Sequence, residues 1–268
     1  MSRHAVLIAI ALVVVIGCTR PSPSSVAARG GCTGCHEEHY VNAGSCESCH
    51  RGNPDASRKE LAHDRLIRGR AAQYRLASNP AVREGERRVG QLACRRCHTI
   101  GNTGNRLATS LDRAVWKRDQ SELERSIHEP VESMPRFALS ATQTEEVVAY
   151  LLHGASPAAA DPGYQVRFAR RGGASGSKFD EHCGGCHRAL LADGPAGRGS
   201  AGPNLSGLFT EYHPPTAPEN KQWVAESLRD WLRNPRAFRS RTSMRPVQLD
   251  AGEWSGLVAE LTVEIRVE

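Results

Sequence analysis

Apolar residues recur every three or four positions through most of the chain, which is the spacing of one face of a helix. This periodicity predicts six helices in the C-terminal two thirds of the chain, over residues 82–93, 120–127, 142–153, 176–183, 221–233 and 250–260. A seventh helix is expected over 61–74, where apolar residues lie among arginines. No segment shows the apolar and polar alternation that predicts a strand. The pattern therefore indicates a mainly α fold.

The N-terminus carries an uninterrupted apolar run of 12 residues, over 5–16. This is the length of a signal-peptide core and is too short to span a bilayer. The run ends in Ile16-Gly17-Cys18, which resembles the lipobox of bacterial lipoproteins, where the cysteine is diacylated. We therefore expect a signal peptide over 1–17, lipidation of Cys18 and a Pro/Ser-rich tether over 18–29. Ordinary cleavage that leaves Cys18 as a thiol is the alternative.

The other eight cysteines all fall into one motif, C-x-x-C-H, which occurs four times. The copies are Cys32-x-x-Cys35-His36, Cys46-x-x-Cys49-His50, Cys94-x-x-Cys97-His98 and Cys183-x-x-Cys186-His187. Two thiols three residues apart lie on one side of a helical turn, where they can add to two vinyl groups of a porphyrin. The next residue directs its imidazole at the iron. This is the attachment motif of c-type haem, so we expect four covalent haem c groups.

Three other uses of these cysteines compete with haem attachment. Four disulfides suit an oxidising compartment, but they leave the histidine after each second cysteine unexplained. A zinc ribbon formed by the four N-terminal cysteines would leave the other two pairs without partners. Iron–sulfur ligation is a third use, although haem is the more natural exported cofactor. Haem also fits the aromatic content of 5%, because a porphyrin supplies apolar core.

Stretches rich in glycine and proline divide the chain into three units. A loop-rich dihaem module is expected over 30–78, one single-haem domain over 79–155 and another over 164–268, with a linker over 156–163. Within the last domain, the Gly/Pro-rich stretch 192–220 is expected to form a long loop wrapped over a haem edge.

Each single-haem domain contains one methionine next to or near a proline, in the loop before its final helix. Both domains resemble class I cytochromes c, over residues 82–153 and 174–262. The resemblance implies that an N-terminal helix crosses the C-terminal helix. It also implies a proximal histidine and a distal methionine on each iron, which here are His98 with Met134 and His187 with Met244. The expected fold is thus mainly α, with two tandem cytochrome c-like domains after the dihaem module.

One loop of this family orients the proximal imidazole through a backbone carbonyl. Its Gly-Pro-x-Leu sequence matches Gly202-Pro203-Asn204-Leu205 in the C-terminal domain. The middle domain has Ala108-Thr109-Ser110-Leu111 at this place and lacks the proline.

The N-terminal module has no methionine and resembles the paired-haem segments of small multihaem c-type cytochromes, over residues 30–70. That resemblance implies iron held by two histidines. The spare histidines are His39 and His63. His39 lies one turn after His36, on the proximal side of its own haem, and is better placed for the second haem. His63 would then serve the first. The swapped assignment, a surface His39 and a propionate-bonded His63 are the alternatives.

The formal net charge of +6 and the pI near 9.0 do not indicate a nucleic-acid partner. The expected compartment is outside the cytoplasm, and eight ionised haem propionates would outweigh the formal charge. The arginines are therefore expected to serve in part as counter-ions.

The sequence thus predicts an electron carrier without catalytic residues, lipid-anchored on the periplasmic side of a bacterial membrane. Its expected partners are redox proteins or a membrane quinol-oxidising complex, and its acceptor is periplasmic or terminal. Methionine ligation raises the potential relative to a second histidine, so the dihaem module is expected at the low-potential end. The alternatives are a fixed subunit of a respiratory complex and a haem enzyme, either a peroxidase or a small-oxyanion reductase, which would need an open iron position.

Overall fold

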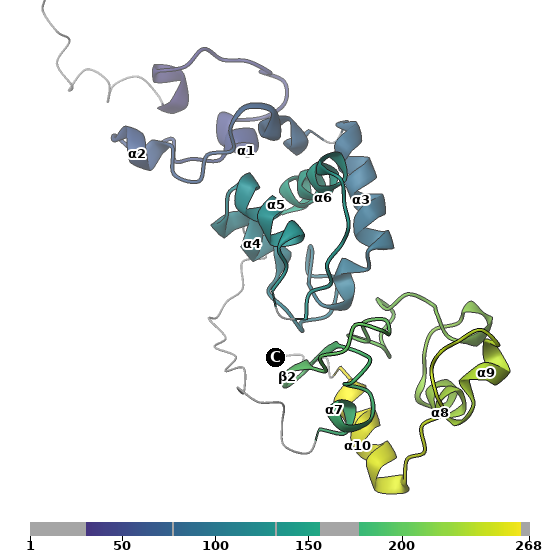
Figure 1. The fold of residues 1–268 in the computed structure, drawn as a ribbon. Coiled ribbons are helices and arrows are strands. Elements are labelled where there is room, and N and C mark those ends of the chain that lie inside the picture. The colour runs from purple at the N-terminus through teal and green to yellow at the C-terminus, as the bar shows by residue number, and fades with distance from the viewer. Residues whose placement is uncertain (1–30, 77, 132, 156–176, 264–268) are drawn as a thin grey trace, which may run out of the picture.

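The computed structural model describes residues 31–76, 78–131, 133–155 and 177–263. The protein is mainly helical, and three units follow one another in chain order (Figure 1). The predicted signal peptide, the lipidated Cys18, the tether and the linker 156–163 lie outside the described residues. Among the helices that the structure describes, none has the length and apolar character needed to cross a membrane.

The N-terminal module is built from short elements: the 3₁₀ helix η2 (Gly31–Gly34), α1 (Cys46–His50), α2 (Lys59–Ala62) and the 3₁₀ helix η3 (Gly69–Arg75). The single helix predicted over 61–74 is wrong. The chain leaves α2 at Ala62 and enters η3 at Gly69. Between these elements Arg65 has a φ of 54°, and Gly69 has a φ of 53°. These left-handed conformations interrupt a right-handed helix.

The middle domain contains α3 (Pro80–Gln91), the 3₁₀ helix η4 (Cys94–Arg96), α4 (Leu111–Lys117), α5 (Gln120–His128) and α6 (Ala141–Gly154). The helices predicted over 82–93, 120–127 and 142–153 are confirmed within two residues, whereas α4 was not predicted. Local sequence explains the starts: Asp119 and Ser140 each form a capping box at the head of α5 and α6.

The core of the middle domain lies where α3 crosses α6. Gly85 allows this approach, because a Cβ there would lie 1.9 Å from the carbonyl oxygen of Glu146. Arg88 forms an ion pair with Glu146 beside the crossing. Val89 and Val148 are buried within it. The crossing of the first and last helices that the class I resemblance implies is therefore present in this domain.

The N-terminal module shares this core. Four of its residues belong to the same buried cluster as α3 and α6: Ile67, Ala71, Ala72 and Tyr74. The Tyr74 hydroxyl donates a hydrogen bond to Glu145 on α6. Arg75 Nη1 donates to the Leu152 carbonyl at 2.7 Å, and Arg75 Nε donates to the Ser48 carbonyl at 2.9 Å. The module is thereby held against the C-terminal end of α6.

The C-terminal domain contains α7 (Lys178–His182), β1 (Ala189–Leu191), β2 (Gly194–Ala196), the 3₁₀ helix η6 (Pro218–Asn220), α8 (Ala225–Arg233), α9 (Pro235–Phe238) and α10 (Ala251–Leu261). β1 and β2 pair antiparallel, with Ala189 opposite Ala196. The prediction of no strands is wrong here, because strands of three residues are too short to show alternation. The stretch 192–220 is otherwise mostly irregular, as predicted. The helix expected over 221–233 begins only at Ala225.

The first and last helices of this domain also meet. The Glu260 carboxylate on α10 accepts hydrogen bonds at the head of α7 from the backbone N–H groups of Lys178, at 2.8 Å, and Phe179, at 2.9 Å. It also accepts one from the Ser177 hydroxyl at 2.9 Å. A carboxylate at a helix N-terminus satisfies free N–H groups and interacts favourably with the helix dipole. α7 and α10 are therefore joined by a partly buried polar cap.

Candidate haem-binding sites

All four C-x-x-C-H segments fold as one helical turn. In three of them the histidine N–H donates to the carbonyl of the first cysteine, with distances of 3.0 Å at His36, 3.1 Å at His98 and 2.9 Å at His187. The fourth segment, α1, is helical throughout. All eight motif cysteines are free thiols. No disulfide joins these cysteines in the part of the chain that the structure describes.

Three of the four motif histidines are oriented by backbone carbonyls. Nδ1 of His50 lies 3.0 Å from the Ile67 oxygen, that of His98 lies 2.7 Å from the Thr109 oxygen, and that of His187 lies 2.8 Å from the Pro203 oxygen. Because a carbonyl only accepts, each Nδ1 carries the proton and Nε2 keeps its lone pair. This is the tautomer of a histidine that binds a metal through Nε2.

The middle and C-terminal domains make this contact from corresponding loops after the motif. Thr109 supplies the carbonyl in the middle domain although its loop lacks the Gly-Pro pair of the C-terminal domain. In the C-terminal domain the contact is so close that a Cβ on Gly202 would lie 2.2 Å from Cε1 of His187. The absence of the proline in the middle domain therefore does not remove the orienting carbonyl.

In the N-terminal module each motif histidine lies beside one spare histidine. Nε2 of His39 lies 3.3 Å from Nε2 of His50. The rings of His36 and His63 have centroids 5.8 Å apart and are tilted by 46°. These are the pairs of the crossed assignment. The two motifs are also adjacent. The thiol of Cys46 lies near that of Cys32, and burial together with this neighbour raises the pKa of Cys32.

Each methionine packs on the apolar cluster that also contacts the first cysteine of its domain. Met134 and Cys94 lie against the core of the middle domain. Met244 and Cys183 lie against the core of the C-terminal domain. Trp231 Nε1 donates to the Met244 sulfur at 3.0 Å. The packing thus brings each thioether and its motif to the same core.

Burial favours the neutral form of two motif cysteines and one motif histidine. It raises the pKa of Cys94 and of Cys183 to about 11, and it lowers the pKa of His98. Imidazoles with a free Nε2 and thioether sulfur atoms are iron ligands of c-type haem, and cysteine thiols attach the porphyrin. Among the described residues, the one cluster of three metal-ligating side chains is formed by Glu181, His182 and Glu253. The four N-terminal cysteines, all of them described, form no such cluster.

One loop of the C-terminal domain contacts the motif of the middle domain. Arg96 Nη1 donates to the Asn204 carbonyl at 3.2 Å, and Asn105 Nδ2 donates to the Thr210 hydroxyl at 2.9 Å. The Ser206 hydroxyl is hydrogen-bonded to the thiol of Cys97. Sequence reasoning missed this interface, because Arg96 and Asn204 both stand at positions that their motifs leave unspecified. Arg96 is an x residue of C-x-x-C-H, and Asn204 is the x residue of Gly-Pro-x-Leu.

Sequence reasoning also missed Arg51, which follows His50 directly. Its side chain is buried against α4, although nothing in its sequence context distinguishes it from the many exposed arginines. Burial, together with the charges of Arg75 and Arg65, lowers the pKa of Arg51 to about 10.

These sites, together with a family match over part of the chain, support an electron-transfer haem protein that is similar to c-type cytochromes. Residues 80–151 match the family model described as cytochrome C oxidase, cbb3-type, subunit III. This range runs from α3 into α6 and includes Cys94, Cys97, His98 and Met134. The match supports a class I c-type cytochrome domain with covalently attached haem c, as predicted for this part of the chain. The comparisons with curated proteins and with solved structures gave no match.

Proposed function

We propose that this protein is a membrane-tethered tetrahaem cytochrome c that passes electrons between a quinol-linked membrane complex and a periplasmic or terminal acceptor. The observation that carries the proposal is the pairing of His36 with His63 and of His39 with His50, beside two domains that each hold one motif histidine and one methionine. This gives two kinds of ligand set within one chain.

The side chains have distinct roles in this proposal. Bound haem c supplies one-electron chemistry. The cysteine pairs would hold it covalently, and the motif histidines together with His39, His63, Met134 and Met244 would bind the iron. The chain would thus offer two iron ligands for each of four haems and leave none open to a substrate, which favours an electron carrier over a haem enzyme.

The ligand types also give a direction. Two histidines set a lower potential than histidine with methionine, so electrons enter at the N-terminal module and leave from the cytochrome domains. The three units lie in this order along the molecule (Figure 1). The tether from Cys18 would hold the low-potential end near the membrane, where a quinol-oxidising complex acts.

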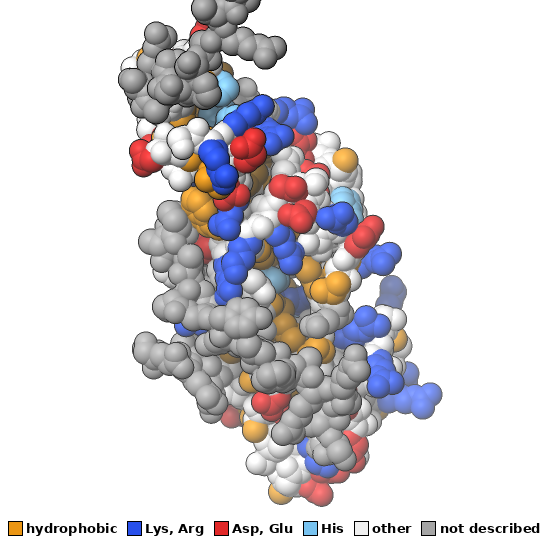
Figure 2. All heavy atoms as spheres, turned by 90° about the vertical axis from the view of Figure 1, so that its left-hand side faces the viewer, with side chains coloured by type: hydrophobic (Ala, Val, Ile, Leu, Met, Phe, Trp, Pro, Cys, Tyr) orange, Lys and Arg blue, Asp and Glu red, His pale blue; other side chains and the backbone are white. Residues whose placement is uncertain are grey.

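One face of the molecule carries charged side chains of both signs, which suits the docking of redox partners (Figure 2). Lysine and arginine are interspersed with aspartate and glutamate over the upper part of the face in Figure 2. Mixed charges suit weak, fast docking, in which electrostatics governs the rate of encounter more than the affinity.

A potentiometric titration of the purified full-length protein, with low-temperature spectra, tests the proposal. We expect mass spectrometry to give four haem increments, and the spectra to give two bis-histidine haems at low potential and two histidine–methionine haems at high potential. A protein without four haem increments, or with zinc in their place, contradicts the tetrahaem proposal. A bis-histidine pair that titrates above the other two haems reverses the direction.

A second function is favoured by the family match itself. The matched family is described as a subunit of an oxidase, which supports a fixed cytochrome subunit of a respiratory complex. Stoichiometric co-purification with a membrane complex under mild detergent distinguishes this role from that of an independent carrier. Five-coordinate high-spin haem in the resting protein would instead favour the enzyme alternative.

A further inference from the structure

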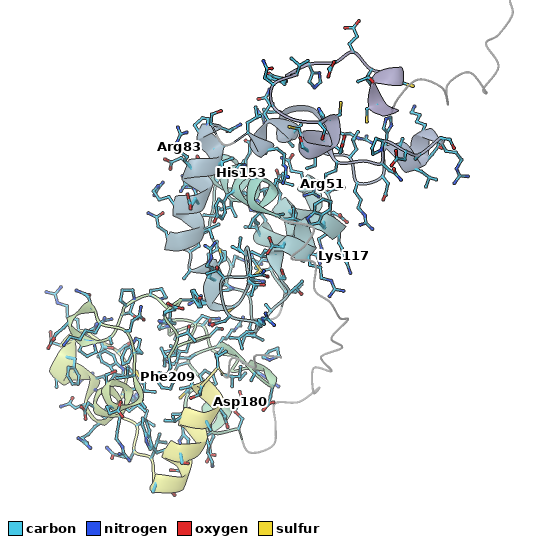
Figure 3. The ribbon with its side chains drawn as sticks, turned by 180° about the vertical axis from the view of Figure 1, so that it is seen from behind. Arg51, Arg83, Lys117, His153, Asp180 and Phe209 are labelled. Atoms are coloured by element: carbon cyan, nitrogen blue, oxygen red, sulfur yellow. The ribbon has the colours of Figure 1, made fainter. Side chains whose placement is uncertain are left out.

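Arg51 is buried at the junction of the N-terminal module and the middle domain. Only 6% of the residue is exposed, and it lies between the module and the end of α4 that carries Lys117 (Figure 3). Its Nη1 donates to the Val115 carbonyl at 2.8 Å. Its guanidinium carbon lies 4.1 Å from the centre of the Trp116 ring. A charged side chain of one unit is thus inserted into the surface of the next.

Most of the donors at this junction have no partner. Arg51 Nε and Nη2 and Trp116 Nε1 are all buried, and none has a hydrogen-bond partner among the described residues. Arg65 and Arg75 lie close enough to add positive potential at the same place. Buried donors are almost always paired, and a buried cation without an anion is costly. The junction therefore lacks one negatively charged acceptor.

We propose that Arg51 and Trp116 form a carboxylate-binding site that holds a haem propionate at this junction. The inference rests on the proposed function, since haem is the source of the carboxylate. Two guanidinium N–H groups of one unit and one indole N–H of the other are without partners at this junction, and a forked guanidinium matches the two oxygens of a carboxylate. The contacts to Val115 and to the Trp116 ring account for Nη1 and for one face of the guanidinium, but they leave the other donors unexplained.

Two haems can supply this propionate. Arg51 directly follows His50, the histidine of the second motif. Trp116 packs on the core that also contacts Cys94 and Met134 of the third motif. The haem of the second motif would be bis-histidine and that of the third motif histidine–methionine, so their spectra would differ. If the second motif's haem supplies the propionate, Trp116 binds the haem of the other unit. If the third motif's haem supplies it, Arg51 does so, and in both cases the two units are coupled electrostatically.

The test uses the purified full-length holoprotein with Arg51→Met and Trp116→Phe. Arg58→Met is the matched control, because it removes the same charge from an exposed arginine of the same module. The measurements are a haem-resolved potentiometric titration and the resonance Raman bands of the propionates. Loss of a nearby cation favours the ferric state. At a fixed applied potential, we expect Arg51→Met to lower the ferrous-to-ferric ratio of one haem about tenfold. This corresponds to a reduction potential that is lower by about 59 mV for one electron.

The other variants give independent outcomes. Trp116→Phe removes one donor without a charge and is expected to change the same propionate band with a smaller effect on the potential. The spectral class of the haem that responds identifies the source of the carboxylate. Should Arg51→Met fail to fold, Arg51→Lys, which keeps the charge, takes its place and is expected to change the band with little change of potential.

Intact haems whose potentials and propionate bands are the same in the Arg51 variant, in Trp116→Phe and in Arg58→Met would overturn the site. That result leaves the tetrahaem function in place. Absence of the haem increments from the wild-type mass would instead contradict the proposed function itself.

Discussion

Asn204 Nδ2 donates a hydrogen bond of 3.0 Å to the carbonyl of Ser133, the residue before Met134. The carbonyl of Asn204 accepts from Arg96, which lies within the motif of the middle domain. The preceding residue, Pro203, orients His187. Two consecutive residues, Pro203 and Asn204, therefore connect a proposed distal loop and one motif of the middle domain with the proposed proximal histidine of the C-terminal domain. Such contacts fix the separation of two haem sites, on which the rate of electron transfer between them depends.

Replacing Asn204 by alanine removes the bond to Ser133 and the two bonds that its Oδ1 accepts from the backbone N–H and the hydroxyl of Ser206. We expect the domains to separate more readily, at a cost of about 1–3 kcal/mol, because buried partners lose their hydrogen bonds. Hydrogen exchange of residues 96–105 and 202–210 should accelerate, while that of the α3 and α6 crossing stays unchanged. Gln248→Ala, an exposed position of the same domain, is the control. Identical exchange in both variants would contradict a structural role for Asn204.

A methyl group at Gly202 tests the proximal contact of the C-terminal domain. The added Cβ would lie 2.2 Å from Cε1 of His187, so the imidazole has to move away from the Pro203 carbonyl. We expect Gly202→Ala to lose one haem increment or to convert one haem to a high-spin spectrum. Gly252→Ala is the control, since a Cβ there meets only an Asp250 oxygen at 3.4 Å. A low-spin spectrum with four haem increments in Gly202→Ala would contradict the expected dependence of the C-terminal haem site on this position of the His187 imidazole.

Three helices of the middle domain, α3, α5 and α6, could be predicted because their information is local. Apolar periodicity and capping residues such as Asp119 and Ser140 are visible in the sequence around each helix. The motif turns are local in the same sense. The carbonyl of Thr109 could not be identified by residue type, because every residue has a carbonyl. Only a family resemblance pointed to this place in the chain.

The contacts between units could not be predicted for a different reason. Arg51 reaches Val115 across 64 positions, and Arg96 reaches Asn204 across 108. Single long-range contacts of this kind leave no periodic pattern, and an arginine reads as a surface residue by default. The hairpin of β1 and β2 was missed because each strand is only three residues long.

Two glycines of α3, one at the crossing with α6 and one away from it, are expected to respond oppositely to replacement by alanine. Gly85→Ala would place a Cβ 1.9 Å from the Glu146 carbonyl and 2.7 Å from Cβ of Tyr150, so the helices have to separate. We expect a loss of about 1–3 kcal/mol in the free energy of unfolding, as for other overpacked cores. Gly90→Ala lies on the same helix in open space and should be stabilising by about 0.5–1 kcal/mol. Denaturant unfolding of both variants measures the difference, and equal stabilities would contradict the close packing.

The attachment of the N-terminal module to α6 is expected to depend on alkaline pH through Tyr74. Burial raises the pKa of this hydroxyl to about 12, and the hydrogen bond that it donates to Glu145 raises it in the same direction. An unfolded tyrosine titrates near about 10, so the folded state binds the proton more tightly than the unfolded state. The contribution of the Tyr74 hydroxyl to the free energy of unfolding is thus fully present below about pH 10 and is lost as the pH rises toward about 12.

The Tyr74→Phe variant removes this linkage while it keeps the buried ring. We expect the stability of the wild type, measured by urea unfolding between pH 9 and pH 12, to fall more steeply than that of the variant. Below pH 9 the variant should be less stable by about 0.5–1.5 kcal/mol, the net value of one hydrogen bond. Tyr40→Phe is the control, because Tyr40 is 62% exposed. Parallel curves for Tyr74→Phe and the wild type above pH 10 would show that the hydroxyl ionises without disturbing the contact with α6.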